Sequence, residues 1–216
     1  MCDSEANKVY KTVEYWDDRF KEEDSYEWLA RYRDVKELLQ KHAPDIFQPD
    51  SSLVSENAKP APRVLIVGCG NSSFSYDLHC AGVRNSVSID YSKVVIERMS
   101  KKHPELEWKK MDMTKMGGFQ DCVFDYIIDK AAMDALVTDE GDPWNPSESS
   151  LNSTRNMITE VVRTLKPGGK FLQISFQQPH FRNMYLRSDD FEEQQALVDQ
   201  INVGLGYFFY TLQKKS

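Results

Sequence analysis

Residues 64–72 decide the fold, and they read Val64-Leu65-Ile66-Val67-Gly68-Cys69-Gly70-Asn71-Ser72. Four apolar residues form a short buried strand, two glycines make a turn, and helical spacing begins at Ser72. Such a turn lets the backbone approach a ligand closely, and the helix N-terminus offers unpaired N–H groups to a carboxylate or phosphate. A plain tight turn explains the same residues, so the stretch indicates an α/β fold and needs further motifs to indicate a ligand.

Strands and helices alternate after this turn. We expect strands at 64–67, 86–89, 106–110, 123–128, 170–175 and 206–212, and helices at 72–81, 93–101 and 151–165. A further strand is expected near 196–203, with a partly helical 191–202 as the alternative. The alternation predicts a doubly wound, mostly parallel sheet with helices on both faces.

The N-terminal part is helical and rich in aromatic residues. We expect helices at about 9–23 and 27–42, and a loop at 49–62, where serine, asparagine, lysine and proline residues gather. The sequence therefore predicts a single domain over residues 1–216, with N-terminal helices (1–48), a loop (49–62) and an α/β core (63–216).

Composition limits the classes of partner and site. The 216 residues carry a net charge of −7 with a pI of about 5.2, which disfavours binding to a nucleic-acid backbone. No apolar run reaches the roughly 20 residues that span a membrane, and the polar first residues do not resemble a signal peptide. The four cysteines form no C-x-x-C pair and have no histidine cluster beside them, so we expect no metal site. Scattered thiols suit the cytoplasm.

Acidic residues follow the second and third expected strands. Asp90-Tyr91 stands where Rossmann-like folds place a ribose-binding acid, and Tyr91 can lie along an adenine face. Asp112 and Met113 follow the third strand, where a carboxylate and a backbone N–H can bind the adenine edge. Each acid also has a plain structural explanation, as a helix cap or a loop residue. A nicotinamide site usually has a third glycine where Ser73 stands here, so a ligand with ribose and adenine but no pyrophosphate is favoured, such as S-adenosylmethionine.

Charged residues also follow the fourth strand. Asp129, Lys130 and Asp134 lie at the sheet edge that should face a reactive methyl group. Two carboxylates there can hold a cationic substrate amine. A solvated Asp129–Lys130 pair, with Asp134 as a charge at the start of a helix, is the alternative.

Together these motifs resemble class I, seven-strand methyltransferases that use S-adenosylmethionine. Within that class the chain is similar to the methyltransferase-like protein-lysine methyltransferases that modify translation elongation factor 1-alpha, over about residues 12–182. The Gly68–Ser72 turn and Pro167-Gly168-Gly169 carry the resemblance in the core, and Glu14-Tyr15-Trp16-Asp17 and Tyr26-Glu27-Trp28 carry it at the N-terminus. Two positions depart from the usual class I pattern. Ile66 replaces an acidic residue, and Ser72 replaces a third glycine.

The resemblance implies a Rossmann-like seven-stranded sheet with an N-terminal helical lid, and it implies roles for individual residues. The expected cofactor-binding residues are Trp16, Phe20 and Trp28 in the lid, Gly68 and Gly70 at the amino-acid portion, Asp90 and Tyr91 at ribose and adenine, Asp112 and Met113 at the adenine edge, and Lys130. Cation–π contacts from such a lid suit a sulfonium ligand.

The expected reaction is methyl transfer to a lysine of elongation factor 1-alpha, with Asp129 and Asp134 holding the amine. The acidic, proline-containing segment 138–150, with Trp144 inside it, is expected to face the substrate. A small-molecule methyltransferase, a cofactor-binding scaffold without catalysis and a dinucleotide oxidoreductase are the alternatives.

Overall fold

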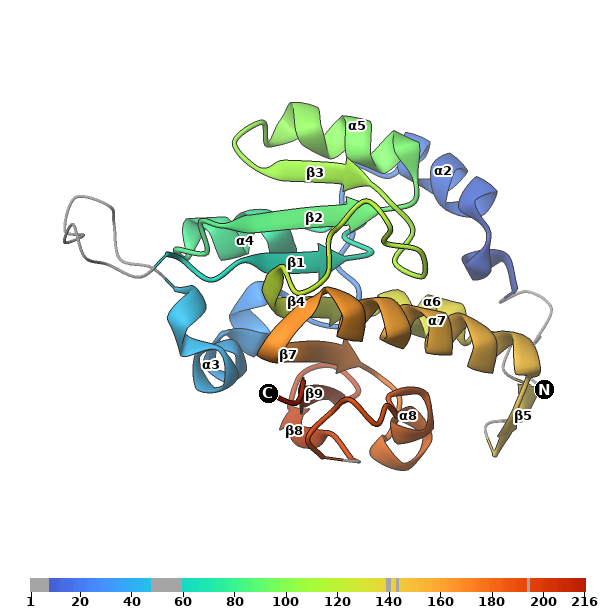
Figure 1. The fold of residues 1–216 in the computed structure, drawn as a ribbon. Coiled ribbons are helices and arrows are strands. Elements are labelled where there is room, and N and C mark those ends of the chain that lie inside the picture. The colour runs from blue at the N-terminus through green and yellow to red at the C-terminus, as the bar shows by residue number, and fades with distance from the viewer. Residues whose placement is uncertain (1–7, 48–59, 139–140, 143, 194) are drawn as a thin grey trace.

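A computed structural model describes residues 8–47, 60–138, 141–142, 144–193 and 195–216. Within these ranges the main sheet has seven strands in the order β3-β2-β1-β4-β7-β9-β8 (Figure 1). Their bounds are β1 Val64–Val67, β2 Ser86–Asp90, β3 Glu107–Lys110, β4 Phe124–Lys130, β7 Leu165–Ser175, β8 Leu197–Ile201 and β9 Tyr207–Gln213.

The first five strands of the sheet run parallel. β1 pairs with β2 and with β4, so that Ile66 lies between Ser88 and Ile128. β3 and β7 extend the parallel sheet on either side, and β9 inserts antiparallel between β7 and β8. The predicted seven-stranded, mostly parallel sheet is confirmed.

Helices cover both faces of the sheet, as the alternation predicted. One apolar layer packs α3 (Tyr32–His42), α4 (Phe74–Cys80) and α5 (Lys93–Lys102) against one face. The other layer packs α6 (Ala132–Leu136), α7 (Glu148–Thr164) and α8 (Pro179–Tyr185) against the opposite face. The strand residues alternate accordingly, since Ile66 belongs to the first layer and its neighbours Leu65 and Val67 belong to the second.

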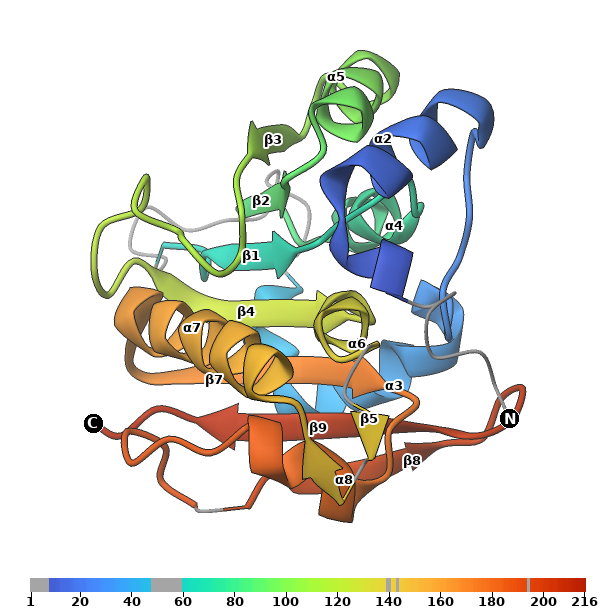
Figure 2. The same cartoon turned by 90° about the vertical axis from the view of Figure 1, so that its right-hand side faces the viewer.

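The N-terminal segment divides into a part over the sheet edge and a part in the core. The 3₁₀ turn η1 (Lys8–Lys11) and α2 (Val13–Glu22) lie beyond the carboxyl ends of β1 and β2 (Figure 2). α3 instead belongs to the core layer, where Val35 and Leu39 are fully buried, and the short turn η2 (Pro44–Ile46) follows it.

Several expected boundaries were wrong. The second helix begins at Tyr32 rather than 27, because Leu29 has a positive φ of 62°, which interrupts a helix. The helix expected from 151 begins at Glu148, since Ser147 accepts a hydrogen bond from the N–H of Ser150 at 3.2 Å and caps it. The segment near 196–203 is the strand β8, and the helical alternative for 191–202 was wrong.

The expected loop at 138–150 is in part a small hairpin, with β5 (Gly141–Asp142) paired to β6 (Asn145–Pro146). Most of the expected 49–62 loop, residues 1–7 of the N-terminal segment, and Asp139 and Glu140 lie outside the described residues. No helix in the described ranges is both long enough and apolar enough to span a bilayer.

Candidate active site

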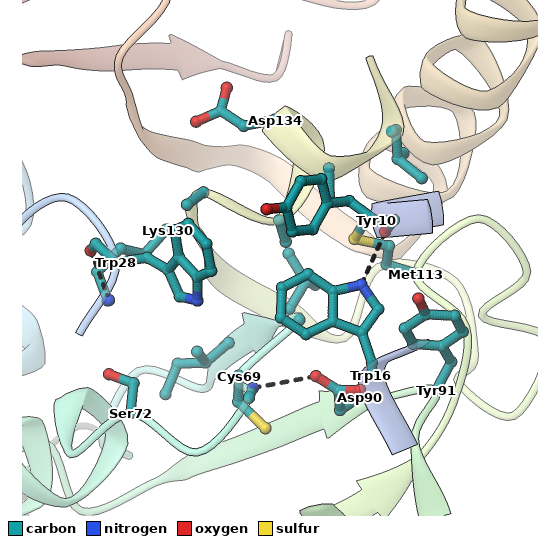
Figure 3. A pocket seen from close by; sticks show the side chains of 18 of the residues that line it. Tyr10, Trp16, Trp28, Cys69, Ser72, Asp90, Tyr91, Met113, Lys130 and Asp134 are labelled. Atoms are coloured by element: carbon teal, nitrogen blue, oxygen red, sulfur yellow. Dashed lines mark hydrogen bonds between the residues drawn. The ribbon is translucent and has the colours of Figure 1, made fainter. Parts of the chain in front are cut away.

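The strands β1, β2 and β4 end at a cavity of about 520 Å³. Every residue expected to bind the cofactor or the substrate amine lines it, except Asp129. These lining residues are Trp16, Phe20, Trp28, Gly68, Gly70, Asp90, Tyr91, Asp112, Met113, Lys130 and Asp134. Figure 3 labels Asp90 and Tyr91 from the sheet edge and Trp16 and Trp28 from the N-terminal segment. The cavity therefore gathers side chains from the sheet edge and from the N-terminal segment.

The glycine turn after β1 is shaped by packing as well as by access to the cavity. Gly68 has φ +57°, and a Cβ there would lie 2.3 Å from the Cβ of Ala132 at the start of α6. Gly70 has φ +52° and donates its N–H to Oδ2 of Asp90 at 3.0 Å. Both positions need glycine for backbone conformation, and Gly68 also needs it for the close approach of α6.

Asp90 is a buried carboxylate at the end of β2. Its oxygens accept the N–H groups of Gly70 at 3.0 Å and Ser92 at 2.9 Å, and only 5% of the residue is exposed. Burial raises the pKa of Asp90 to about 6, against these two hydrogen bonds. The cap of α5 is Ser92, whose Oγ accepts from Val95, so Asp90 is not the surface cap that was its structural alternative.

The residues after β2 and β3 complete this end of the cavity. The Tyr91 hydroxyl donates to the carbonyl oxygen of Thr12 at 3.2 Å, which joins the strand end to the N-terminal segment. Oδ1 of Asp112 accepts the N–H and the hydroxyl of Thr114, both at 2.8 Å. Asp112 therefore shapes its own loop while it lines the cavity beside Met113.

Aromatic rings from the N-terminal segment cover the cavity. The ring of Trp16 stacks on Phe20 with centroids 5.5 Å apart and meets Trp28 edge-on at 6.0 Å. The indole N–H of Trp16 donates to the carbonyl oxygen of Tyr10 at 2.7 Å, which fixes η1 against α2 (Figure 3). The Arg19 guanidinium lies 5.0 Å from the Trp28 ring. We call Tyr10, Trp16, Phe20 and Trp28 the aromatic cover.

An ion pair ties this cover to the sheet. Lys130 at the end of β4 donates to Oε2 of Glu27 at 3.3 Å and to the Trp28 carbonyl at 3.0 Å. Glu27 also accepts the Ser72 hydroxyl at 2.7 Å and the Ser73 N–H at 2.6 Å. Burial opposes its charge, but Lys130 and these donors hold the pKa of Glu27 below its usual value, whereas burial lowers the pKa of Lys130. The Glu27 carboxylate therefore accepts the Ser73 N–H at the start of α4, a donor that we had expected to bind a ligand.

The two carboxylates at the other end have different surroundings. Asp129 is fully buried behind the cavity wall, where it accepts the N–H of Ala132 at 2.8 Å and the amide of Gln173 at 2.7 Å. Burial raises the pKa of Asp129 to about 6. Asp134 lines the cavity and pairs with Arg182 of α8. The structure therefore places Asp134, and not Asp129, at the cavity.

Sequence reasoning missed four residues that matter to this arrangement: Tyr10, Glu27, Phe176 and Arg182. Tyr10 lines the cavity from 58 positions before Gly68, Glu27 pairs with Lys130 of the cavity wall, and Phe176 follows β7. The aromatic density before position 30 was the available signal for Tyr10. Arg182 had none, because its partner lies 48 positions away.

Comparison with known proteins identifies the family. A family model described as a methyltransferase domain matches residues 58–204. The chain belongs to this methyltransferase family. The mouse protein EEF1A lysine methyltransferase 4 is 36% identical over 184 residues, which are 82% of this chain and 66% of that protein. Its bovine counterpart is 32% identical over 97% of this chain and 78% of its own length.

The chain also resembles one part of a larger enzyme. The human eEF1A lysine and N-terminal methyltransferase is 34% identical over 81% of this chain, but over only 23% of its own length. The methyltransferase described here thus spans just under two thirds of the mouse relative and less than a quarter of the human one.

Solved structures confirm the methyltransferase fold. A SAM-dependent methyltransferase from Methanosarcina mazei has a TM-score of 0.52 at 19% identity, covering 73% of this chain and 94% of that one. The N-methyltransferase NodS from Bradyrhizobium japonicum, solved with S-adenosyl-L-homocysteine, has a TM-score of 0.52 at 16% identity, covering 72% and 79%.

The cofactor of this methyltransferase is S-adenosylmethionine, and the cavity fits it. A volume of about 520 Å³ lies within the usual range for small-molecule sites, about 300–1,000 Å³. Asp90 is a buried acceptor bonded only to backbone N–H groups among the hydrogen bonds of the described residues, which suits a ribose diol. The aromatic cover suits a sulfonium.

Proposed function

We propose that the chain is a protein-lysine N-methyltransferase and that its substrate is translation elongation factor 1-alpha. The observation that carries the proposal is a cofactor-sized cavity with the Asp134 carboxylate in its wall, in a chain 36% identical to a lysine methyltransferase named for that substrate. A carboxylate at this place gives a cationic amine a partner beside the cofactor.

Cofactor binding is proposed to follow the two sides of the cavity. Asp90 accepts the ribose hydroxyls, while Tyr91, Asp112 and Met113 surround the adenine. Gly68 and Gly70 let the backbone approach the amino-acid portion, with Lys130 beside it. Trp16, Phe20 and Trp28 cover the ligand, and their contacts support these roles.

When bound, S-adenosylmethionine supplies an electrophilic methyl group on a sulfonium. The protein must bring a neutral lysine amine in line with it, and at neutral pH a free lysine is deprotonated only at a cost of roughly 4 kcal/mol. We propose that Asp134 holds and orients the amine, directly or through one water. Asp129, which holds the backbone of Ala132 at the start of α6, positions Asp134 instead of touching the substrate.

The substrate is proposed to dock beside the β5–β6 hairpin. Trp144 in this hairpin is 74% exposed, with its ring 4.9 Å from Phe181 and 5.4 Å from His180 of α8. Phe176 is 55% exposed and also lines the cavity, so aromatic surface occurs both at the cavity and on the hairpin and α8. This surface and the net charge of −7 suit a basic partner.

We also propose a cytoplasmic location, where elongation factor 1-alpha acts. Three free thiols in the described residues, at Cys69, Cys80 and Cys122, fit a reducing compartment.

The test is methylation of purified elongation factor 1-alpha with labelled S-adenosylmethionine. We expect label on a lysine side chain, located by peptide mass spectrometry. Label in a small molecule of a protein-free extract, but not in protein, would favour a metabolite methyltransferase. Calorimetric binding of S-adenosylhomocysteine without any transfer would favour a scaffold.

A further inference from the structure

Arg182 is the largest fully buried side chain among the described residues. It lies on the short helix α8, and none of its surface is exposed. A buried guanidinium is costly unless it is paired with an anion and hydrogen-bonded. Its hydrogen-bond partners therefore indicate which anion the Arg182 guanidinium stabilises.

Within the described residues, the Arg182 side chain donates hydrogen bonds only to Asp134 and Ser175. Nη2 pairs with Oδ1 of Asp134 and donates to Oγ of Ser175 at 2.9 Å. Ser175, at the end of β7, donates its hydroxyl to the same Oδ1 at 2.7 Å. Nε and Nη1 have no partner in the described ranges, so the polar contacts of this side chain concentrate on Asp134 and the residue that supports it.

The two carboxylate oxygens of Asp134 differ in their hydrogen-bond partners. Oδ1 has two donors, whereas Oδ2 has no partner within the described residues although it is buried. Asp134 as a whole is 6% exposed and lines the cavity. One oxygen thus anchors the side chain, and the other is a buried acceptor that no hydrogen bond of the described residues satisfies.

The net charge of the groups around Asp134 also favours an incoming cation. Asp129 of β4 and Arg182 of α8 face it, and the Tyr210 phenol of β9 is near enough to interact with both members of the pair. Glu27 and Lys130 balance each other. With both aspartates ionised, these five charged groups carry one more negative charge than positive charge.

We propose that Arg182 is a positioning residue that keeps Asp134 ionised and turned so that its second oxygen receives the ammonium of the substrate lysine. This inference rests on the proposed lysine methylation. Arg182 itself does not touch the substrate, because its side chain is fully buried and does not line the cavity.

The proposal predicts how the pH dependence of the methylation rate shifts when Arg182 is replaced. Burial raises the pKa of Asp134, and Arg182 and Ser175 oppose that rise. Removing the guanidinium therefore raises the pKa of Asp134 further, so its carboxylate forms only at higher pH. The acid limb of the methylation rate must then move to higher pH, which a mere packing defect does not cause.

The experiment compares Arg182→Met, Arg182→Lys and Asp134→Asn with the wild type, using full-length protein and purified elongation factor 1-alpha. For Arg182→Met at neutral pH we expect kcat/KM for the protein substrate to fall about 10- to 100-fold, the range for a lost hydrogen bond to a charged group. Affinity for S-adenosylhomocysteine, measured by calorimetry, should stay within about threefold, since the proposed cofactor contacts do not include this pair.

Alkaline pH should restore much of the loss in Arg182→Met and none in Asp134→Asn. Arg182→Lys should restore part of it at neutral pH, and it serves as the test if Arg182→Met does not fold. A second readout needs no substrate: carbon NMR titration of the Asp134 carboxyl in the S-adenosylhomocysteine complex should give a higher pKa in the variants.

An equal loss at every pH, or a parallel loss of S-adenosylhomocysteine affinity, would overturn the positioning role and leave a structural one. An unchanged Asp134 titration would overturn it too. If the wild type methylates no elongation factor 1-alpha, the proposed substrate fails while the titration still decides the role of Arg182.

Discussion

The carboxylates at the two ends of the cavity have different kinds of partner. At the end near β2, Asp90 accepts backbone N–H groups and has no cation among its hydrogen-bond partners in the described residues. At the end near α6, Asp134 in the cavity wall is paired with Arg182, and Glu27 is paired with Lys130 of the wall. Figure 3 shows Asp90 and Asp134 on opposite sides of the site.

The difference indicates which ligand group each end is made for. A carboxylate without a cation, raised to a pKa of about 6, has its lone pairs available to neutral hydroxyl groups. A carboxylate paired with a cation is fixed in direction, which suits a second, incoming cation. The comparison therefore supports the proposal that the nucleoside binds at the first end and that methyl transfer takes place at the second.

The largest expected effect comes from Asp90→Ala, which removes the acceptor at the nucleoside end. Affinity for S-adenosylhomocysteine should fall about 100-fold, because two hydrogen bonds to a charged group are lost. Isothermal calorimetry measures this, with the exposed Asp121→Ala as the matched control. An unchanged dissociation constant would remove the ribose assignment.

Breaking the pair at the other end should act on stability first. Glu27→Gln leaves Lys130 buried without its anion, and we expect the free energy of unfolding to fall by about 2 kcal/mol. Affinity for S-adenosylhomocysteine should fall less than in Asp90→Ala. Urea denaturation compares it with Glu37→Gln, a control at an exposed position of α3. If both variants were equally stable, the pair would not hold the aromatic cover in place.

The pH dependence should separate the two ends without any mutation. Because the pKa of Asp90 is raised to about 6, the folded protein binds a proton more readily than the unfolded chain does between about pH 4 and 6. Asp90 therefore stabilises the fold as the pH falls through this window, and its unfavourable contribution returns as the pH rises. Binding has the opposite sign: affinity for S-adenosylhomocysteine should weaken by up to about tenfold per pH unit below about pH 6.

The matched variant for this titration is Asp90→Asn, whose affinity should vary little over the same range. Equal slopes in the wild type and the variant would mean that another group controls binding.

The smallest effect is expected outside the cavity. Trp144→Ala should raise KM for elongation factor 1-alpha about threefold and leave affinity for S-adenosylhomocysteine unchanged, since exposed aromatic contacts contribute about 0.5–1 kcal/mol. The exposed Tyr76→Ala is the control. If KM did not change, the substrate would dock elsewhere. Neutralising Asp142 together with Asp139 and Glu140, two residues outside the described ranges, tests electrostatic steering at low and high salt.

Local sequence patterns were enough to predict the sheet and the end of the cavity near β2. The apolar run at 64–67 and the glycines after it define β1 and its turn, and Asp90 and Asp112 follow directly from where their strands end. Residues at the ends of parallel strands meet at one edge, so their proximity could be predicted without coordinates.

The transfer end could not be predicted in this way, because its contacts join distant segments. Arg182 reaches Asp134 from 48 positions away, and Glu27 reaches Lys130 from 103 positions away. The left-handed conformation of Leu29, which ends any helix before Tyr32, also has no signal in its residue type. Asp129 and Asp134 looked equivalent in sequence, and only the structure separates the buried position of Asp129 in β4 from that of Asp134 in α6 at the cavity.

The most direct test of the account is methyl transfer to purified elongation factor 1-alpha by the wild type, Asp90→Ala and Asp134→Asn at saturating S-adenosylmethionine. We expect the wild type to methylate a lysine, and the methyl-transfer activity of Asp90→Ala to recover at high cofactor concentration. The activity of Asp134→Asn should not recover, although this variant should still bind S-adenosylhomocysteine normally. Full transfer by Asp134→Asn, or transfer to no lysine at all by the wild type, would contradict it.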